Sequence, residues 1–407
     1  MSGPADAGIP PLKRHGARVL IAGGGGTGAA LAWDLALRGL DVVLAERGEF
    51  TSGTTGRHHG QLHCGARYAV GDRSIARECM AETLILRRVV PEAIEYNGGV
   101  FVALTDDEAE YADTFLSACL ESGIPAREHP PAVARSWEPA INPAAKRTVW
   151  VPDGTIDAYR LPLSFLAGAA GLGARLWSFT ELESVELSSG RAVSATLRGP
   201  DGKRHAESFD VLVNAAGAWA GQVGELAGLD IGITPAPGAM VAVRGRLSDM
   251  VVSRLAPPGD GDIIVPQRGL SIIGSTQSRA ESPDGILPRP EDVAFLLSRA
   301  DELIPGFSSA PVHAAWAAAR PLAGRAATDA EGRAISRDFQ VLDHAADGVR
   351  GMFTLIGGKA TVLRAMAEKA ADAVCAQLGI AEPCLTAELR LPSWRRMFPG
   401  MEGRARL

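Results

Sequence analysis

The chain of 407 residues contains little cysteine and little lysine. Its five cysteines lie at positions 64, 79, 119, 375 and 384 and form no C-x-x-C pair. This spacing predicts reduced thiols and neither an iron–sulfur cluster nor a zinc site, so we expect no metal. Only five of the 41 basic residues are lysines, the net charge is −6, and no basic stripe is present, which argues against a nucleic-acid partner.

Long apolar runs are also missing. Residues 1–17 hold Pro, Gly and a Lys-Arg pair without an apolar core, so they predict a loose tail rather than a signal peptide. The apolar residues between 19 and 45 are interrupted by glycines and charges, which argues against a transmembrane segment. We therefore expect a cytoplasmic protein, and its length favours two domains with a large core.

The most informative stretch opens with a strand and a glycine turn. Residues 19–22 form a short apolar run typical of a buried strand, and residues 23–28 read GGGGTG, which fits the pattern G-x-G-x-x-G. In a nucleotide-binding turn of this kind, Gly23 makes the tight turn and Gly25 lets a pyrophosphate approach the backbone. Gly28 lets the following helix lie close to the strand.

A helix and a second strand are predicted after this turn. Residues 29–38 are rich in Ala and Leu and predict a helix, with Gly39 as its stop, and residues 41–45 predict a strand. Glu46 ends that strand at the position of an acid that binds a ribose diol. The unit therefore predicts a dinucleotide site, because N–H groups at a helix start attract phosphates. The motif alone does not separate FAD from NAD.

The next residues favour a flavin. Residues 51–56 are small Ser, Thr and Gly residues that suit a second pass along a pyrophosphate. Polar side chains follow at His58, His59, His63, Arg67 and Tyr68. A lone histidine is usually structural, but three within six residues beside a dinucleotide indicate that at least one is functional. A cluster of polar side chains beside a dinucleotide-binding unit is typical of proteins that hold a flavin and its substrate there.

The sequence of this stretch resembles that of the FAD-dependent glycerol-3-phosphate dehydrogenases, and most of all that of the catalytic A subunit of the anaerobic bacterial enzyme. The similarity is carried by residues 23–47 and 52–70, and the HxGxRY block at 63–68 is its most specific part. It continues in VPDGTIDAYRL (151–161), VNAAGAWA (213–220), ARPL (319–322), SRDF (336–339) and GGK (357–359). The resemblance implies a mixed α/β fold of the glutathione-reductase type, in the amino-acid-oxidase group, with an FAD-binding Rossmann-like domain and an antiparallel-sheet substrate domain.

The resemblance also implies FAD as cofactor and an FAD-binding set drawn from several segments. We expect this set to be Gly23, Gly25, Thr27, Gly28, Glu46, Arg47, Ser52, Gly53, Thr54, His59, Gly60, Leu62, Leu182, Ala215, Gly217, Trp219, Gly357, Gly358, Lys359 and Ala360. N–H groups at the start of the closing helix would stabilise negative charge on the reduced flavin ring.

The implied reaction is oxidation of a CH–OH group to a carbonyl, by hydride transfer to flavin N5, on glycerol 3-phosphate or a related polyol or sugar-type alcohol. His63 is the best candidate base because the ordinary pKa of histidine lies near operating pH, although the choice among the three histidines stays open. Arg67 and Tyr68 would orient the substrate or the flavin edge. The catalytic residues expected are His63, Arg67, Tyr68, Arg320 and Lys359.

Arg320 is expected to grip the substrate phosphate, because a guanidinium forms paired N–H contacts with an anion. Arg337 is a weaker second candidate. Residues 360–364 read ATVLR, so a hydroxyl and a phenol common in the family are missing after GGK, and Ala319 stands where the family has valine. The C-terminal extension expected to pass electrons onward is absent from these 407 residues. The substrate and the electron acceptor, which could be O2, a quinone or a carrier protein, therefore stay open.

The remaining pattern predicts a discontinuous organisation. We expect an FAD-binding domain from residues 17–96, 151–231 and 320–390, a substrate domain from 97–150 and 232–319, and tails at 1–16 and 391–407. Further predicted helices cover 72–96, 106–122 with Thr105 as N-cap, 159–172, 291–304 and 360–378. Further predicted strands cover 98–104, 176–187, 192–197 and 210–220, with an antiparallel meander over 232–316.

Two other functions remain possible from the sequence. An amine or amino-acid oxidase of the same fold would use Arg320 to grip a carboxylate. A flavoprotein subunit that is inactive without a partner would carry the same cofactor motifs. Reduction of the flavin by an alcohol, an amine or neither substrate would distinguish the three.

Overall fold

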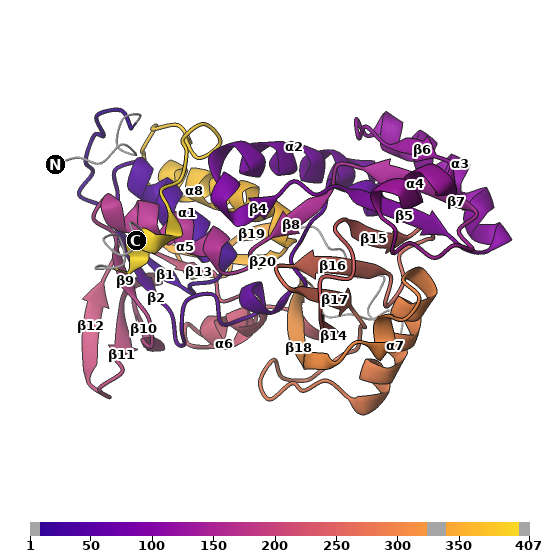
Figure 1. The fold of residues 1–407 in the computed structure, drawn as a ribbon. Helices are drawn as coiled ribbons and strands as arrows, with labels where there is room; N and C mark the ends of the chain where they lie inside the picture. Colours follow the sequence, from indigo (N-terminus) through magenta and orange to yellow (C-terminus); the bar gives the residue numbers. More distant parts are fainter. Residues whose placement is uncertain (1–8, 324–338, 399–407) are drawn as a thin grey trace, which may run out of the picture.

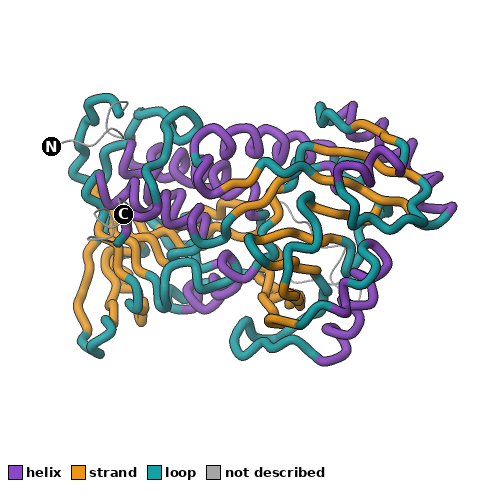
Figure 2. Tube along the Cα trace, in the orientation of Figure 1, coloured by secondary structure: helices purple, strands orange, loops and turns teal. Residues whose placement is uncertain are grey.

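The computed structural model describes residues 9–323 and 339–398. Two large sheets dominate these residues, one on the left and one on the right in Figure 1. Figure 2 shows the helices gathered along the upper side of the left sheet and at the margins of the right one. This arrangement confirms the mixed α/β fold with both parallel and antiparallel strands.

The left sheet has six strands in the order β19-β20-β13-β1-β2-β9. Its strands β1, β2, β9, β13 and β20 pair in parallel, and the edge strand β19 pairs antiparallel to β20. The bounds are β1 (Arg18–Ala22), β2 (Asp41–Ala45), β9 (Arg175–Trp177), β13 (Val211–Asn214), β19 (Phe339–Asp343) and β20 (Met352–Gly357). The apolar run at 19–22 and the run at 41–45 are strands as predicted.

Each face of this sheet has its own core. Val19, Ile21 and Val213 pack against α1 (Gly26–Leu37), α5 (Arg160–Gly171) and α8 (Leu363–Leu378). Leu20 and Leu212 face the other side, where they pack against a small antiparallel sheet and α6 (Ala220–Glu225). That small sheet consists of β10 (Glu181–Ser188), β11 (Arg191–Arg198) and β12 (Arg204–Ser208). Strands buried on both faces explain the near-continuous apolar runs.

The right sheet has eight strands in the order β18-β14-β17-β16-β15-β5-β7-β6, and only β15 and β5 pair in parallel. The bounds are β5 (Gly99–Ala103), β6 (Arg127–His129), β7 (Arg147–Val151), β14 (Ile233–Arg244), β15 (Val251–Arg254), β16 (Ile263–Gln267), β17 (Leu270–Gly274) and β18 (Val312–Ala323). The predicted antiparallel meander is therefore confirmed in β14, β16, β17 and β18.

Further helices and a second small sheet complete the described chain. α3 (Asp106–Glu121) begins at the predicted N-cap, because Thr105 and Glu108 form a reciprocal capping box. The other helices are α2 (Arg73–Val89), α4 (Pro131–Trp137) and α7 (Pro290–Leu303), and the small sheet pairs β3 (Gln61–Leu62), β8 (Gly154–Ile156) and β4 (Ile94–Glu95). In this part of the chain no helix is long and apolar enough to cross a membrane.

Several predicted bounds were wrong. The helix predicted over 72–96 ends at Val89, because Pro91 cannot continue it and holds Val90 out of the helical region. The strand predicted over 176–187 is broken at Phe179, whose φ of 51° turns the chain from one sheet into another. The strand predicted over 210–220 stops at Asn214, whose side chain donates to the Ala220 carbonyl at 2.8 Å and closes a turn.

The two helices that flank the cavity also start at other residues than predicted. α1 begins three residues early, at Gly26 within the glycine turn. The closing helix opens with a 3-10 turn over Ala360–Val362 and becomes α-helical at Leu363. The division into an FAD-binding domain and a substrate domain stays a prediction, and β18 runs across its boundary at 319 and 320.

Candidate active site

A cavity of about 1150 Å³ lies between the two large sheets. This volume exceeds the range of about 300 to 1000 Å³ common for small-ligand sites. One wall is formed where the parallel strands β1, β2, β13 and β20 end, and the other by β14, β16, β17 and β18 of the second sheet. Ligands of open parallel sheets bind outside these carboxyl ends, so the cavity lies where a dinucleotide is expected.

The glycine turn forms the floor of the cavity at one end. Gly23 has a φ of 113°, and a Cβ there would lie 2.6 Å from the Ala215 carbonyl oxygen. A Cβ on Gly28 would lie 2.0 Å from the Gly23 carbonyl oxygen, so this glycine lets α1 lie against the turn. A Cβ on Gly25 would meet only the Thr55 side chain, at 3.1 Å. Space is thus kept open in front of Gly25.

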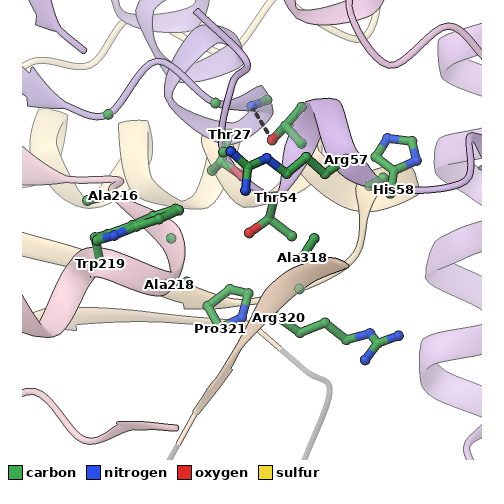
Figure 3. A pocket seen from close by; sticks show the side chains of 18 of the residues that line it. Thr27, Thr54, Arg57, His58, Ala216, Ala218, Trp219, Ala318, Arg320 and Pro321 are labelled. Atoms are coloured by element: carbon green, nitrogen blue, oxygen red, sulfur yellow. Dashed lines mark hydrogen bonds between the residues drawn. The ribbon is translucent and has the colours of Figure 1, made fainter. Parts of the chain in front are cut away.

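The segment over residues 51–57 lies against this turn. The Gly26 N–H donates to Thr55 Oγ1 at 2.9 Å, and the Thr51 N–H donates to the Gly24 carbonyl at 3.0 Å. The second sheet holds the same segment, because Thr54 Oγ1 donates to the Ala319 carbonyl at 2.6 Å. The residues expected to make a second pass along a pyrophosphate therefore lie beside the first pass, as Figure 3 shows for Thr27 and Thr54.

Glu46 is fixed at the end of β2. Its two carboxylate oxygens accept the Gly24 N–H at 2.8 Å and the Gly48 N–H at 2.7 Å. The carboxylate lines the cavity together with Leu182 of β10. An acid held in this way beside the glycine turn is suited to a ribose diol.

The closing segment of the chain forms another part of the cavity wall. Gly357 and Gly358 have φ values of 79° and 86°, and a Cβ on Gly358 would lie 2.2 Å from Met366 Sδ. These glycines bring Lys359 to the cavity wall, where its Nζ lies 5.1 Å from the centre of the Tyr68 ring. Such a cation–π contact places a positive charge beside the HxGxRY block.

Two of the three histidines have a defined tautomer. The Gly60 N–H donates to His58 Nδ1 at 2.8 Å, and the Gln61 N–H donates to His59 Nδ1 at 3.2 Å. A ring nitrogen that accepts a hydrogen bond carries no proton, so each neutral ring carries its proton on Nε2. Burial lowers the pKa of His58 to about 4 and that of His59 to about 3. Both rings are therefore neutral donors at the cavity wall.

His63 differs from its two neighbours. Its Nδ1 is buried and has no hydrogen-bond partner among the described residues. Burial first, and then the charges of Lys359 and Arg67, lower the pKa of His63 to about 3. Its ring meets the Tyr68 ring edge-on at 5.4 Å between centroids. His63 is thus a neutral imidazole whose tautomer is not fixed by a hydrogen bond to Nδ1 from the described residues.

A buried aspartate behind the cavity supports this block. Asp153 accepts the Cys64 N–H at 2.7 Å and the Gln61 side-chain amide at 2.8 Å. It is 1% exposed, and burial raises its pKa. The segment around Asp153 therefore holds the backbone on both sides of Leu62 and so fixes where His63 points.

Two arginines reach the cavity from different elements. Arg67 Nη2 donates to the Gly259 carbonyl at 2.8 Å and to Asp262 Oδ2 at 3.0 Å. Arg320, on β18, donates to Ser275 Oγ and to the carbonyls of Thr276 and Ala236. In Figure 3 the Arg320 guanidinium points away from Thr54, toward the side of the view that holds His58.

Most of the predicted site residues lie together. The cavity is lined by His63, Arg67, Tyr68, Arg320, Lys359, Gly23, Gly25, Thr27, Glu46, Arg47, Ser52, Gly53, Thr54, His59, Leu182, Ala215, Gly217, Trp219, Gly357, Gly358 and Ala360. Gly28, Gly60 and Leu62 do not line it. Leu62 is fully buried in the core and Gly60 packs against Gln267, so both lie behind the wall. Arg337 falls outside the described residues.

Some lining residues were not predicted. The side chain of Arg57 extends toward Thr27 and Thr54 in Figure 3, and its position inside the polar segment could have identified it. Asp284 accepts the Trp219 indole N–H at 2.7 Å across 65 residues of sequence, and no local pattern indicates it. Arg47 lies over the same indole, 5.5 Å from its centre.

A phosphate-binding turn at the end of a parallel sheet, joined to a chamber of histidines and cations, defines a dinucleotide-dependent oxidoreductase. Residues 18–371 match the model of the family described as FAD dependent oxidoreductase (DAO). The chain belongs to this family, and FAD is its cofactor. The open space before Gly25, the anchored Glu46 and the unpartnered ring nitrogen of His63 fit this group.

Similarity to curated proteins supports membership of this family. The chain is 40% identical over 386 residues to the A1 protein of the anaerobic glycerol-3-phosphate dehydrogenase of Haloferax volcanii, in an alignment that covers 92% of this chain and 66% of the relative. It is 40% identical over 378 residues to the corresponding A protein of the Escherichia coli K12 enzyme, with 92% and 70% covered. The chain thus spans about two thirds of the length of these relatives.

A solved structure has the same fold. The glycerol-3-phosphate dehydrogenase of Bacillus halodurans complexed with FAD superposes with a TM-score of 0.70 at 23% identity, covering 92% of this chain and 68% of that one.

Proposed function

We propose that this flavoenzyme oxidises the CH–OH group of glycerol 3-phosphate, or of a related polyol or sugar-type alcohol, to a carbonyl. The observation that carries the proposal is the convergence of a neutral histidine and three cations, Arg67, Arg320 and Lys359, on the same cavity that the glycine turn lines. The relatives named as glycerol-3-phosphate dehydrogenases support the substrate class. When bound, FAD accepts a hydride at N5.

His63 is the residue proposed to take the hydroxyl proton. His58 and His59 already accept backbone N–H groups at Nδ1, so neither has a second lone pair to offer. His63 keeps an unpartnered ring nitrogen, and its lowered pKa leaves it deprotonated at neutral pH. A positioned general base contributes about 10²- to 10⁴-fold to the rate and contributes least when its pKa lies far below the operating pH, so the lowered pKa of His63 indicates the lower part of this range.

Arg320 and Lys359 are proposed to bind or polarise the substrate. Arg320 is held on β18 by Ser275 and two carbonyls, so little side-chain entropy is lost when it binds an anion. Lys359 follows two glycines at the cavity wall and lies over Tyr68. Tyr68 therefore contacts both this cation and His63.

Anaerobic bleaching of the flavin tests the proposal. The holoenzyme is mixed with glycerol 3-phosphate, glycerol, other polyols and sugars, and a panel of amines and amino acids, and the absorbance of the flavin is followed. We expect glycerol 3-phosphate or a related alcohol to bleach it. Bleaching by amines alone would make the protein an amine oxidase, in which Arg320 holds a carboxylate. Bleaching by no compound until a partner protein is added would make it an incomplete subunit.

A further inference from the structure

Arg67 is held by one half of its guanidinium only. Its Nη2 makes the two contacts with Gly259 and Asp262, at 2.8 and 3.0 Å. Its Nη1 is buried and has no hydrogen-bond partner in residues 9–323 or 339–398. An unsatisfied buried donor is costly, and Arg67 lines the cavity. An anionic group in the cavity would supply the missing acceptor.

Asp262 holds Arg67 through Nη2 and so leaves Nη1 available. Asp262 does not itself line the cavity. Asp262 comes directly before β16 and is 2% exposed. Its carboxylate accepts the Gly259 N–H at 2.7 Å and Arg299 Nη2 at 3.2 Å as well as Arg67. A carboxylate with three donors from three segments has little freedom to move.

Asp262 is anchored further by a row of alternating charges. Arg299 lies on α7 and donates to Glu302 at 3.0 Å, and Glu302 also accepts from Arg254 on β15. Arg254, which is buried, donates to Glu108 on α3 at 2.7 Å. This row connects the loop behind Arg67 to two helices and a strand of the second sheet. The position of Asp262 is therefore set by the fold and not by the cavity contents.

We propose that Asp262 is a positioning residue that holds Arg67 so that its second nitrogen binds an anionic group of the substrate. This inference rests on the proposed function and narrows it to alcohols that carry a phosphate or carboxylate. A buried ion pair by itself contributes little net stability. A pair that leaves one guanidinium nitrogen without an acceptor favours the binding of an anion instead.

The test compares variants of the holoenzyme with the parent enzyme. Inorganic phosphate is titrated while the flavin absorbance is followed, and kcat and KM are measured with the best anionic substrate. We expect Asp262→Asn to weaken phosphate binding and raise KM about tenfold, the loss of one charge-assisted contact, with a smaller change in kcat. Arg299→Met removes one of the three donors to the same carboxylate while the Gly259 N–H and Arg67 remain, so we expect a smaller loss than in Asp262→Asn, of about two- to threefold.

A double-mutant cycle separates positioning from general structure. In an Arg67→Met background, Asp262→Asn should have no further effect on phosphate binding, because the residue through which it acts is gone. An equal loss in Asp262→Asn and Arg299→Met, or a loss that persists in the Arg67→Met background, would overturn the inference. So would the absence of any phosphate-dependent change in the parent enzyme.

If Asp262→Asn does not fold or does not hold flavin, Asp262→Glu replaces it. This variant keeps the charge beside both arginines but displaces the guanidinium by one methylene, so we expect weaker phosphate binding in a variant that still folds and holds flavin. Parent-like phosphate binding would refute the inference. Failure of glycerol 3-phosphate to bleach a holoenzyme that binds phosphate through Asp262 would remove the proposed reaction and leave the role of Asp262 standing.

Discussion

The two ends of the cavity are built by different means. At the phosphate end, one continuous stretch from β1 to residue 57 supplies mostly backbone groups, and glycines keep space open. At the histidine end, side chains arrive from the HxGxRY block, β18 and the segment before α8, and charge dominates. The first part fits a cofactor through backbone shape, whereas the second part offers charged and titratable side chains, as the proposed binding and deprotonation of a substrate require.

The largest effect is expected at the phosphate end. Gly25→Val should abolish flavin retention, because the side chain would occupy the space kept open in front of the turn. The purified variant should be colourless by absorbance while its circular dichroism stays that of a folded protein. A yellow, fully loaded variant would show that the pyrophosphate does not approach the backbone there.

Gly28→Ala provides the contrast within the same turn. Its Cβ would lie 2.0 Å from a backbone oxygen, so we expect loss of the fold and not only of the flavin. Gly171→Ala at the end of α5 meets nothing within 4 Å and is the control, with a melting temperature unchanged or slightly raised.

At the histidine end, His63→Gln should lower kcat by a factor in the lower part of the range of about 10²- to 10⁴-fold, without loss of flavin. The measurement is the rate of anaerobic flavin reduction at saturating substrate, in parent and variant at equal flavin content. His58→Gln is the comparison, since its Nδ1 is already occupied. A larger drop in His58→Gln than in His63→Gln would move the base to His58.

Arg320→Ala should raise KM for an anionic substrate by about 10- to 100-fold, the worth of one or two charge-assisted hydrogen bonds. Arg320→Lys should recover part of this loss, because a lysine keeps the charge but not the paired N–H groups. Steady-state kinetics with glycerol 3-phosphate and with uncharged glycerol separate charge recognition from damage to the fold. An unchanged KM would exclude Arg320 from substrate binding.

The effect that is smallest near neutral pH is a pH dependence of stability, which grows only as the solution becomes acidic. Burial lowers the pKa values of His58, His59 and His63 to between about 3 and 4, so the unfolded chain binds more protons than the folded one below the ordinary histidine pKa. Stability should therefore decline as pH falls from about 6.5 toward 3, by up to about 1.4 kcal/mol per pH unit for each proton.

Urea unfolding at several pH values checks this slope. His58→Gln should make it shallower, whereas the same substitution at exposed His205 should not. An unchanged slope in His58→Gln would show that this histidine is not held neutral by burial.

The difference between the two ends also explains what could be predicted from the sequence. The glycine turn, Glu46 and the strand and helix around them lie within thirty residues, and local steric rules were enough to predict their arrangement. The bounds of α2 and α8 were missed because Pro91 and a 3-10 turn override an apolar periodicity. Arg320 and Lys359 were predicted through the family resemblance.

Supporting residues such as Asp153, Asp262 and Asp284 were not predicted. Each is an ordinary acidic residue in its own segment, and its partners come from distant parts of the chain. Only the folded chain shows that Asp153 fixes the backbone beside His63 and that Asp284 reaches Trp219 across 65 positions. Polar contacts between segments carry no periodicity that a sequence pattern could detect.

β18 holds the Thr54 hydroxyl and the indole of Trp316 bonds the carbonyl of Arg57, while the same strand bears Arg320. One strand is therefore a common wall of both compartments. If Arg320 binds the substrate anion as proposed, thermodynamic reciprocity requires that any factor by which bound flavin raises the affinity for the anion is also the factor by which the anion raises the affinity for flavin. A substitution in this strand that changes the coupling therefore changes both affinities by the same factor.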